Sequence, residues 1–298
     1  MKKIVLASGL VVGMIGMGLL IGCGGGGSSE PEVAAANLDS RGVDNLGQNI
    51  GDLIPGCVYN SSGVAGLLDD QNTKLYRMLY SNIVHPKQTR AGSVPTNGSC
   101  GGTMQQSGTD ASMTYQFTNY CTGDASGDHV TVNGSVHVSV TKDGDEIKSL
   151  SASTGSSGLT AVTVEDGQTR TDKVYLNGFR FTAGDPTVMS LNELKIASSV
   201  EGTYWVKDVY IEQHGDSDTG TVQIVRAVYI DPNVGAVSIS TNPISLSDEE
   251  DQTVTITVTS QGQTALLRSR TGTAIFDVLK DDQQIGTLDC TAAISDWW

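Results

Sequence analysis

Of the five cysteines of this sequence, the four that follow Cys23 have a number and spacing that predict covalent chemistry; they are Cys57, Cys100, Cys121 and Cys290. In an exported chain an even number of cysteines predicts two disulfides, for which three connectivities exist. Cys100 and Cys121 lie close in sequence across an expected hairpin, which favours a Cys100–Cys121 bond and, with it, a Cys57–Cys290 bond. A metal or redox site is the alternative, but the sequence has no C-x-x-C pair and no histidine beside these cysteines.

Two acidic segments have the composition of a cation site. Asp216 and Asp218 are spaced like carboxylates in the first half of a calcium-binding loop, but no bidentate acid follows at the required distance. Residues 248–251 place four carboxylates in a row, which a divalent ion could bridge. Because an acidic, solvated turn explains both segments, we expect no metal site, and Asp216 and Asp218 are the residues at which to test for one.

The four histidines show none of the spacings of a catalytic or metal-binding pair. His129 and His137 lie on one expected strand and share a face, but their backbones would be about 27 Å apart at about 3.4 Å per residue. The sequence also has no G-x-S-x-G nucleophile motif and no glycine-rich phosphate loop followed by a helix and a lysine. We therefore expect no cofactor.

Charge and composition narrow the range of partners. The chain has 33 acidic against 18 basic residues and a formal net charge of −15, which disfavours nucleic acid and anionic lipid headgroups as partners. Aromatic residues make up only 5% of the chain, whereas glycine is abundant with 36 residues. Such a composition is typical of strands and turns.

Two helices are expected before residue 90. Apolar residues recur at helical spacing from Val43 to Ile54, where Pro55 follows, and again from Val64 to Ile83, where His85-Pro86 follows. The second helix also has the favourable i,i+4 pair Asp70 and Lys74.

From about residue 100 the apolar residues alternate with threonine, serine, asparagine and histidine. Turn signals such as Asp143-Gly144 and Asp166-Gly167 separate the alternating segments. Short polar turns between such segments predict an antiparallel meander of roughly ten to twelve strands. The expected strands include residues 113–117, 130–140, 174–181, 204–211, 222–228 and 254–258.

The N-terminus resembles the leader of bacterial lipoproteins. Met1-Lys2-Lys3 is positively charged, Ile4 to Leu19 is apolar but too short to span a membrane, and Leu20-Ile21-Gly22-Cys23 matches the lipobox. The resemblance implies cleavage before Cys23 and lipidation of its thiol. Because Gly24 and not aspartate follows, it also implies the outer membrane in a diderm bacterium. An ordinary secretory signal is the alternative.

The expected fold is mainly β (α+β), with a helical pair followed by a long antiparallel meander that forms a curved sheet or an incomplete barrel. A long sheet twists strongly, so it must curl, close or be covered. We expect a signal peptide in residues 1–22, a lipid anchor and Gly/Ser tether in 23–36, a helical segment in 37–90, and a β-rich domain packed with the helices in 91–298. A separate module from Val237 to Cys290 is the alternative, against which the Cys57–Cys290 bond argues.

A second resemblance concerns the segments Gly98–Thr103, Tyr115–Cys121 and Val132–Val136. Their sequence pattern is similar to that of uncharacterised, disulfide-containing, β-rich envelope lipoproteins, and this resemblance implies no activity. We therefore expect a non-catalytic envelope lipoprotein, a membrane-anchored binding or structural module whose partner is a lipid, another apolar ligand or an envelope protein. The alternative is an extracytoplasmic hydrolase of polysaccharide or lipid, which would use a carboxylate pair or a Ser–His pair.

Overall fold

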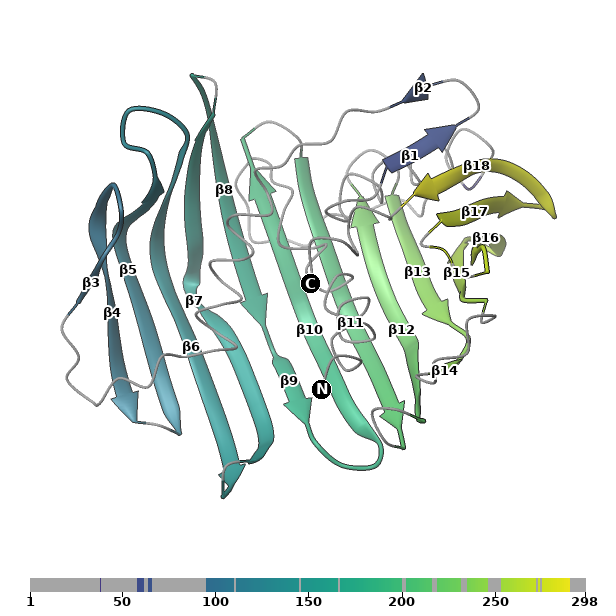
Figure 1. The fold of residues 1–298 in the computed structure, drawn as a ribbon, viewed down its shortest axis with the longest axis horizontal. Helices are drawn as coiled ribbons and strands as arrows, with labels where there is room; N and C mark the ends of the chain where they lie inside the picture. The colour runs from purple at the N-terminus through teal and green to yellow at the C-terminus, as the bar shows by residue number, and fades with distance from the viewer. Residues whose placement is uncertain are drawn as a thin grey trace.

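The computed structural model describes residues 38, 58–61, 64–65, 95–109, 111–144, 146–165, 167–199, 202–215, 219–231, 235–245, 253–271, 273 and 275–289. Apart from Leu38, these residues build one sheet of 18 strands (Figure 1). The strands are β1 Val58–Ser61, β2 Val64–Ala65, β3 Thr96–Asn97, β4 Gly101–Thr109, β5 Ser112–Gly123, β6 His129–Asp143, β7 Glu146–Glu165, β8 Gln168–Asn177, β9 Phe179–Thr182, β10 Thr187–Ser198, β11 Gly202–His214, β12 Thr221–Asp231, β13 Gly235–Thr241, β14 Ile244–Ser245, β15 Thr255–Ser260, β16 Gln263–Ser269, β17 Ile275–Lys280 and β18 Gln283–Asp289.

Most strands from β3 to β18 pair with the next strand along the chain, β13 pairs with β15, and every pairing is antiparallel. Strands β8 and β9 share one position between β7 and β10, and β13 and β14 both pair with β12. In Figure 1 the long strands β4 to β13 lie side by side, and β17 and β18 cross the view at a steep angle to them. The antiparallel meander predicted from the sequence is confirmed.

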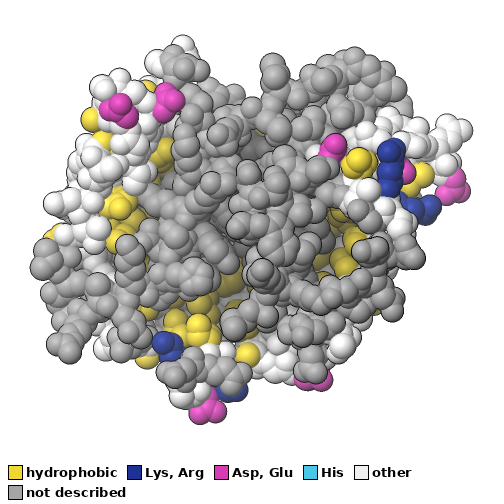
Figure 2. Space-filling view, viewed as in Figure 1, with side chains coloured by type: hydrophobic (Ala, Val, Ile, Leu, Met, Phe, Trp, Pro, Cys, Tyr) yellow, Lys and Arg dark blue, Asp and Glu magenta, His cyan; other side chains and the backbone are white. Residues whose placement is uncertain are grey.

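One face of the sheet, called here the inner face, carries the apolar core. A row of paired residues crosses seven strands on this face, from Met104 on β4 to Tyr204 on β11. Its members between those ends are Phe117, Gly134, Leu159, Val174 and Ile196. Leu38 is fully buried in the same core. Figure 2 shows hydrophobic side chains in the middle of the viewed face and charged side chains toward its rim.

Strand β6 shows why the sequence forms a two-faced sheet. Val130, Val132, Val136, Val138 and Val140 are buried, whereas the residues between them are half-buried or exposed. Successive side chains of a strand point to opposite faces, so period-two alternation places every valine in the core. The opposite face, called here the outer face, therefore receives the polar residues of β6.

The predicted N-terminal helical pair is not supported. The described residues contain no helix, and hence no helix that is long and apolar enough to cross a membrane. Val64, expected to begin the second helix, lies in β2 and pairs with Ser61 of β1, while β1 pairs with β18. Strand β18 is more than 200 residues away from β1 in sequence, so local spacing of apolar residues could not reveal the pairing of these two strands. The rest of residues 37–90 lies outside the described residues.

The number of strands also exceeds the ten to twelve that were predicted, because five of the 18 are only two to four residues long. Strand β10 shows a second way in which the alternation is lost. Leu191 and Leu194 are both buried on the inner face, although they are three residues apart. They pair with Val209 and Val206 of β11, on either side of Asp208, whose φ is +51°. Such an irregularity breaks the two-residue period on both strands, and the sequence of β10 therefore shows no clean alternation.

Candidate functional site

The outer face carries a continuous row of polar side chains that crosses seven strands, from β5 to β12. We call it the serine–arginine row. Each member is paired in register with the next, so all members share one face and lie side by side across the sheet. The row consists of Ser112, Ser139, Ser151, Arg180, Ser190, Tyr210 and Arg226.

The two arginines give the row its charge. Arg180 and Arg226 are exposed, and the guanidinium carbon of Arg226 lies 5.8 Å from the ring centre of Tyr210. Within the described part of the chain, no ion pair involves either of them. A guanidinium group presents a planar set of donors that matches the geometry of carboxylate and phosphate oxygens. The row can therefore bind an anion.

Strand β11 extends this polar surface along its own direction. Tyr210, Glu212 and His214 alternate with residues of the inner face, so their side chains stand on the outer face in sequence. A hydrogen bond with the carboxylate of Glu212 raises the pKa of Tyr210, with smaller contributions from desolvation and from the charge of Glu212, while the charge of Arg226 acts in the opposite direction. The hydrogen bond with Glu212 therefore favours the neutral form of Tyr210.

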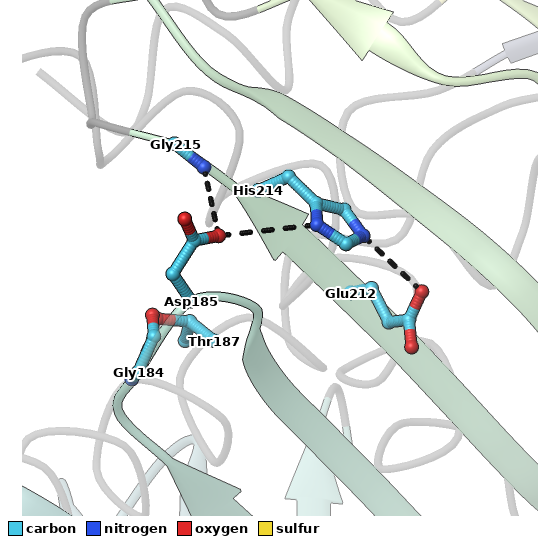
Figure 3. A network of polar contacts seen from close by, with 6 residues as sticks. All are labelled: Gly184, Asp185, Thr187, Glu212, His214 and Gly215. Carbon is cyan, nitrogen blue, oxygen red and sulfur yellow. Dashed lines mark hydrogen bonds and ion pairs between the residues drawn. The ribbon is translucent and has the colours of Figure 1, made fainter.

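A polar cluster lies at the end of β11, where the turn between β9 and β10 approaches it (Figure 3). The ring of His214 lies between two carboxylates, with Nδ1 3.9 Å from Oδ1 of Asp185 and Nε2 3.4 Å from Oε2 of Glu212. The backbone N–H of Gly215 donates to the same oxygen of Asp185 at 3.3 Å. These contacts tie together the ends of two neighbouring hairpins.

His137 lies at the other end of the outer face, among hydroxyl groups. Its Nδ1 is 3.2 Å from Oγ1 of Thr114, and its Nε2 is 3.2 Å from Oγ of Ser139 and 3.4 Å from Oγ of Ser112. Among the described residues these three hydroxyls are the polar side-chain groups in contact with the ring. As predicted, His129 and His137 occupy the same face of β6.

A lysine between two aromatic rings completes the outer face. Nζ of Lys195 lies 5.7 Å from the ring centre of Tyr175 and 5.4 Å from that of Trp205. All three residues are paired in register, on β8, β10 and β11. Such cation–π contacts hold the lysine against the sheet and leave Trp205 buried.

The Cys100–Cys121 disulfide predicted from the sequence is confirmed, with the two Cα atoms 5.1 Å apart. It joins the start of β4 to β5. Next to it, the backbone N–H of Gly123 donates to Oγ of Ser99 at 3.0 Å. These contacts fix the hairpin of β4 and β5, on which Ser112 of the row lies.

The other predicted site residues lie outside the described residues: Cys23, Cys57, Cys290, Asp216, Asp218 and the acidic run 248–251. Within the described residues, no group of three or more histidine, cysteine, aspartate or glutamate side chains has the arrangement of a metal site. The cation, lipidation and second disulfide predictions therefore stay predictions.

Sequence reasoning missed the residues that the fold brings together on the outer face. Arg180, Tyr210 and Arg226 come from three strands, and only the pairing register places them in one row. The polar alternation of Tyr210, Glu212 and His214 was the one signal available in the sequence.

Comparisons with known proteins do not assign the chain to a family. No protein-family model, no curated protein and no solved structure matches it.

Proposed function

We propose that this protein is a non-catalytic, lipid-anchored module of the bacterial cell envelope that uses the outer face of its sheet for binding. The observation that carries the binding role is the serine–arginine row, seven polar residues in register on the face opposite an equally long apolar row. The apolar row has its role in the core. The polar row lies outside the core, and its serine and arginine side chains are suited to hydrogen bonding with a partner.

The arrangement favours binding over catalysis. A catalytic site needs groups that converge on one reacting atom, whereas the members of the row stand beside one another at the spacing of the strands. A partner can therefore contact many of them at once.

The anchoring part of the proposal rests on the leader and on Cys23. Expression of the full chain in a diderm bacterial host with an alkyne-bearing palmitate should label the protein. Cys23→Ser should abolish labelling and leave the unprocessed protein, because the thiol is the acyl acceptor in the family that the leader resembles. Labelling of the Cys23→Ser variant at the wild-type level would contradict the proposal, as would an unlabelled wild-type protein cut to its mature size.

An apolar ligand is the second form of the binding proposal, since the inner face is lined by hydrophobic side chains. Native mass spectrometry of the mature lipidated protein, released from mild detergent, is the direct test. A lipid adduct that is lost under denaturing conditions would support an apolar ligand. A single mass equal to the lipidated chain would leave the outer face as the binding surface.

A hydrolase is the alternative function, and the contacts of His137 are the observation that favours it. A histidine within hydrogen-bond distance of the hydroxyls of Ser112 and Ser139 is the starting arrangement for a nucleophile and its base. His137→Ala and Ser139→Ala should therefore be assayed with wild type on polysaccharide and lipid esters. Hydrolysis by wild type that both variants lose would replace our proposal, and equal rates in all three proteins would exclude this pair as the catalyst.

A further inference from the structure

We propose that the serine–arginine row binds a linear polysaccharide that carries carboxylate groups, a polyuronate, across the strands of the outer face. The inference rests on the proposed function, because it names the ligand of the same surface. The groups that would contact the polysaccharide are the two exposed arginines and the hydroxyl groups between and beside them.

The spacing of the row fits an extended polymer. Arg180 lies on β9 and Arg226 on β12, three strand positions away, which is about 14 Å at about 4.8 Å per strand. Ser190 and Tyr210 occupy the two positions between them. A chain lying across the strands would thus meet two guanidinium groups separated by hydroxyls. Each residue of a polyuronate carries a carboxylate and hydroxyl groups, so an oligomer that crosses these strands can offer a carboxylate at each arginine and hydroxyl groups between them.

The charge of this face differs from that of the whole chain. The protein has a net charge of −15, but five basic side chains stand on the outer face of β8 to β12 against three acidic ones. The basic residues are Lys173, Arg180, Lys195, Lys207 and Arg226, and the acidic ones are Glu193, Asp208 and Glu212. A local excess of positive charge on an acidic protein attracts an anion to that face and repels it elsewhere.

Other anionic polymers fit the surface less well. Single-stranded nucleic acid is bound through exposed aromatic rings on which bases stack. On this face Trp205 is buried, and cationic side chains lie over the two half-buried rings, Lys195 over Tyr175 and Arg226 over Tyr210. Adsorption to a membrane needs protruding apolar side chains, and the large hydrophobic residues exposed in the described part of the chain are Ile147 and Val225. Short serine hydroxyls suit the hydroxyl groups of sugars.

The test is a binding titration of the full-length mature protein, in detergent, with alginate oligomers of defined length. Wild type should bind, and affinity should fall as salt is raised, because the contacts are partly exposed charges. Arg180→Gln with Arg226→Gln should weaken binding at least tenfold, and each single variant by a smaller factor. Arg268→Gln is the matched control, since Arg268 is an exposed arginine of β16 outside the row, and its affinity should equal that of wild type.

Neutral dextran, dextran sulfate and single-stranded DNA of matched length complete the panel. Absence of alginate binding by wild type would overturn the inference, as would unchanged affinity in the double arginine variant. Stronger binding of the sulfated polymer or of DNA would overturn the choice of a polyuronate. The palmitate labelling is independent of these titrations, so a labelled protein that binds no alginate would contradict this inference and leave the anchored module in place.

Discussion

At the scale of single residues, the outer face changes the ionisation of Tyr210. Its hydrogen bond with Glu212 raises the pKa, because the carboxylate stabilises the neutral phenol and repels the phenolate. We predict that Glu212→Gln lowers the pKa of Tyr210 toward the ordinary tyrosine value. The titration can be followed by NMR of ring-labelled tyrosine, with the Tyr210→Phe spectrum to assign the signal.

A matched variant separates this local effect from a general change of charge. Glu193→Gln removes a carboxylate from the same face, but Glu193 is paired with Lys207 and Asn177 rather than with Tyr210. The pKa of Tyr210 should stay at its wild-type position in this variant. An unchanged pKa of Tyr210 in the Glu212→Gln variant would show that the carboxylate of Glu212 does not accept a hydrogen bond from the Tyr210 hydroxyl.

A second prediction at this scale concerns Gly158, which lies in the irregular part of β7. Its φ is +70°, and a Cβ there would lie 2.7 Å from the carbonyl oxygen of Val174 and 3.0 Å from the ring of Tyr175. Gly167 has a similar φ of +75° but open space around the same position. Gly167→Ala should therefore cost about 1 kcal/mol of stability, from backbone strain alone.

Gly158→Ala carries the same strain and in addition displaces β8, so it should lower the free energy of unfolding by about 2 kcal/mol or more. Denaturant unfolding of both variants beside wild type measures the difference. Equal losses of stability in the two variants would mean that β7 and β8 do not approach each other so closely at Gly158.

At the scale of elements, the register between β1 and β18 bears on the second predicted disulfide. Val58 pairs with Asp289, and the next residues in the sequence on the two sides are Cys57 and Cys290. Cα atoms of directly opposed residues in an antiparallel pair are about 4.5–5.5 Å apart, which lies within the range of disulfides. Since Cys100 and Cys121 are already joined, we predict a Cys57–Cys290 bond.

Peptide mapping without reduction tests this prediction. The expected result is one linked peptide containing Cys57 and Cys290 and a second containing Cys100 and Cys121. Recovery of Cys57 and Cys290 as free, alkylatable thiols in protein exported to an oxidising compartment would contradict the prediction. Cys23→Ser protein serves as the control, because it removes the remaining thiol of the chain.

At the scale of the whole molecule, strand pairing continues through the boundary near residue 233, at which the alternative of a separate C-terminal module would divide the chain. Tyr229 of β12 pairs with Val237 of β13, and β18 returns to pair with β1. A sheet and core shared in this way predict a single cooperative unfolding transition. Differential scanning calorimetry of the oxidised protein should show one peak, with calorimetric and van't Hoff enthalpies in agreement.

The tryptophans offer a local probe for the same question. Trp205 is buried in the middle of the sheet, so in a protein with Trp297→Phe and Trp298→Phe the fluorescence reports on β11. Far-UV circular dichroism reports on all strands together, and the two signals should change at the same denaturant concentration. Two separated transitions would mean that the strands after residue 233 unfold as a module of their own.

Much of the fold could be predicted from the sequence, because a two-residue period is a local property. The valines of β6 and the turn at Asp143-Gly144 indicated a strand, its inner face and its end, and the structure confirms all three. Nearness in sequence across a hairpin was likewise sufficient to predict the Cys100–Cys121 bond. The pairing of β1 with β18 and the irregular step between Leu191 and Leu194 depend on distant strands, and no local pattern contains them.

The sequence by itself thus determined that the chain is mainly β, where most of its strands lie and which side chains share a face within each strand. Only the tertiary structure decided which strands lie side by side and in what register. Ser139, Arg180 and Arg226 are far apart in sequence, and they share one row because backbone hydrogen bonds fix the register of β6 to β12. The candidate binding surface is a property of that register, which local side-chain patterns do not encode.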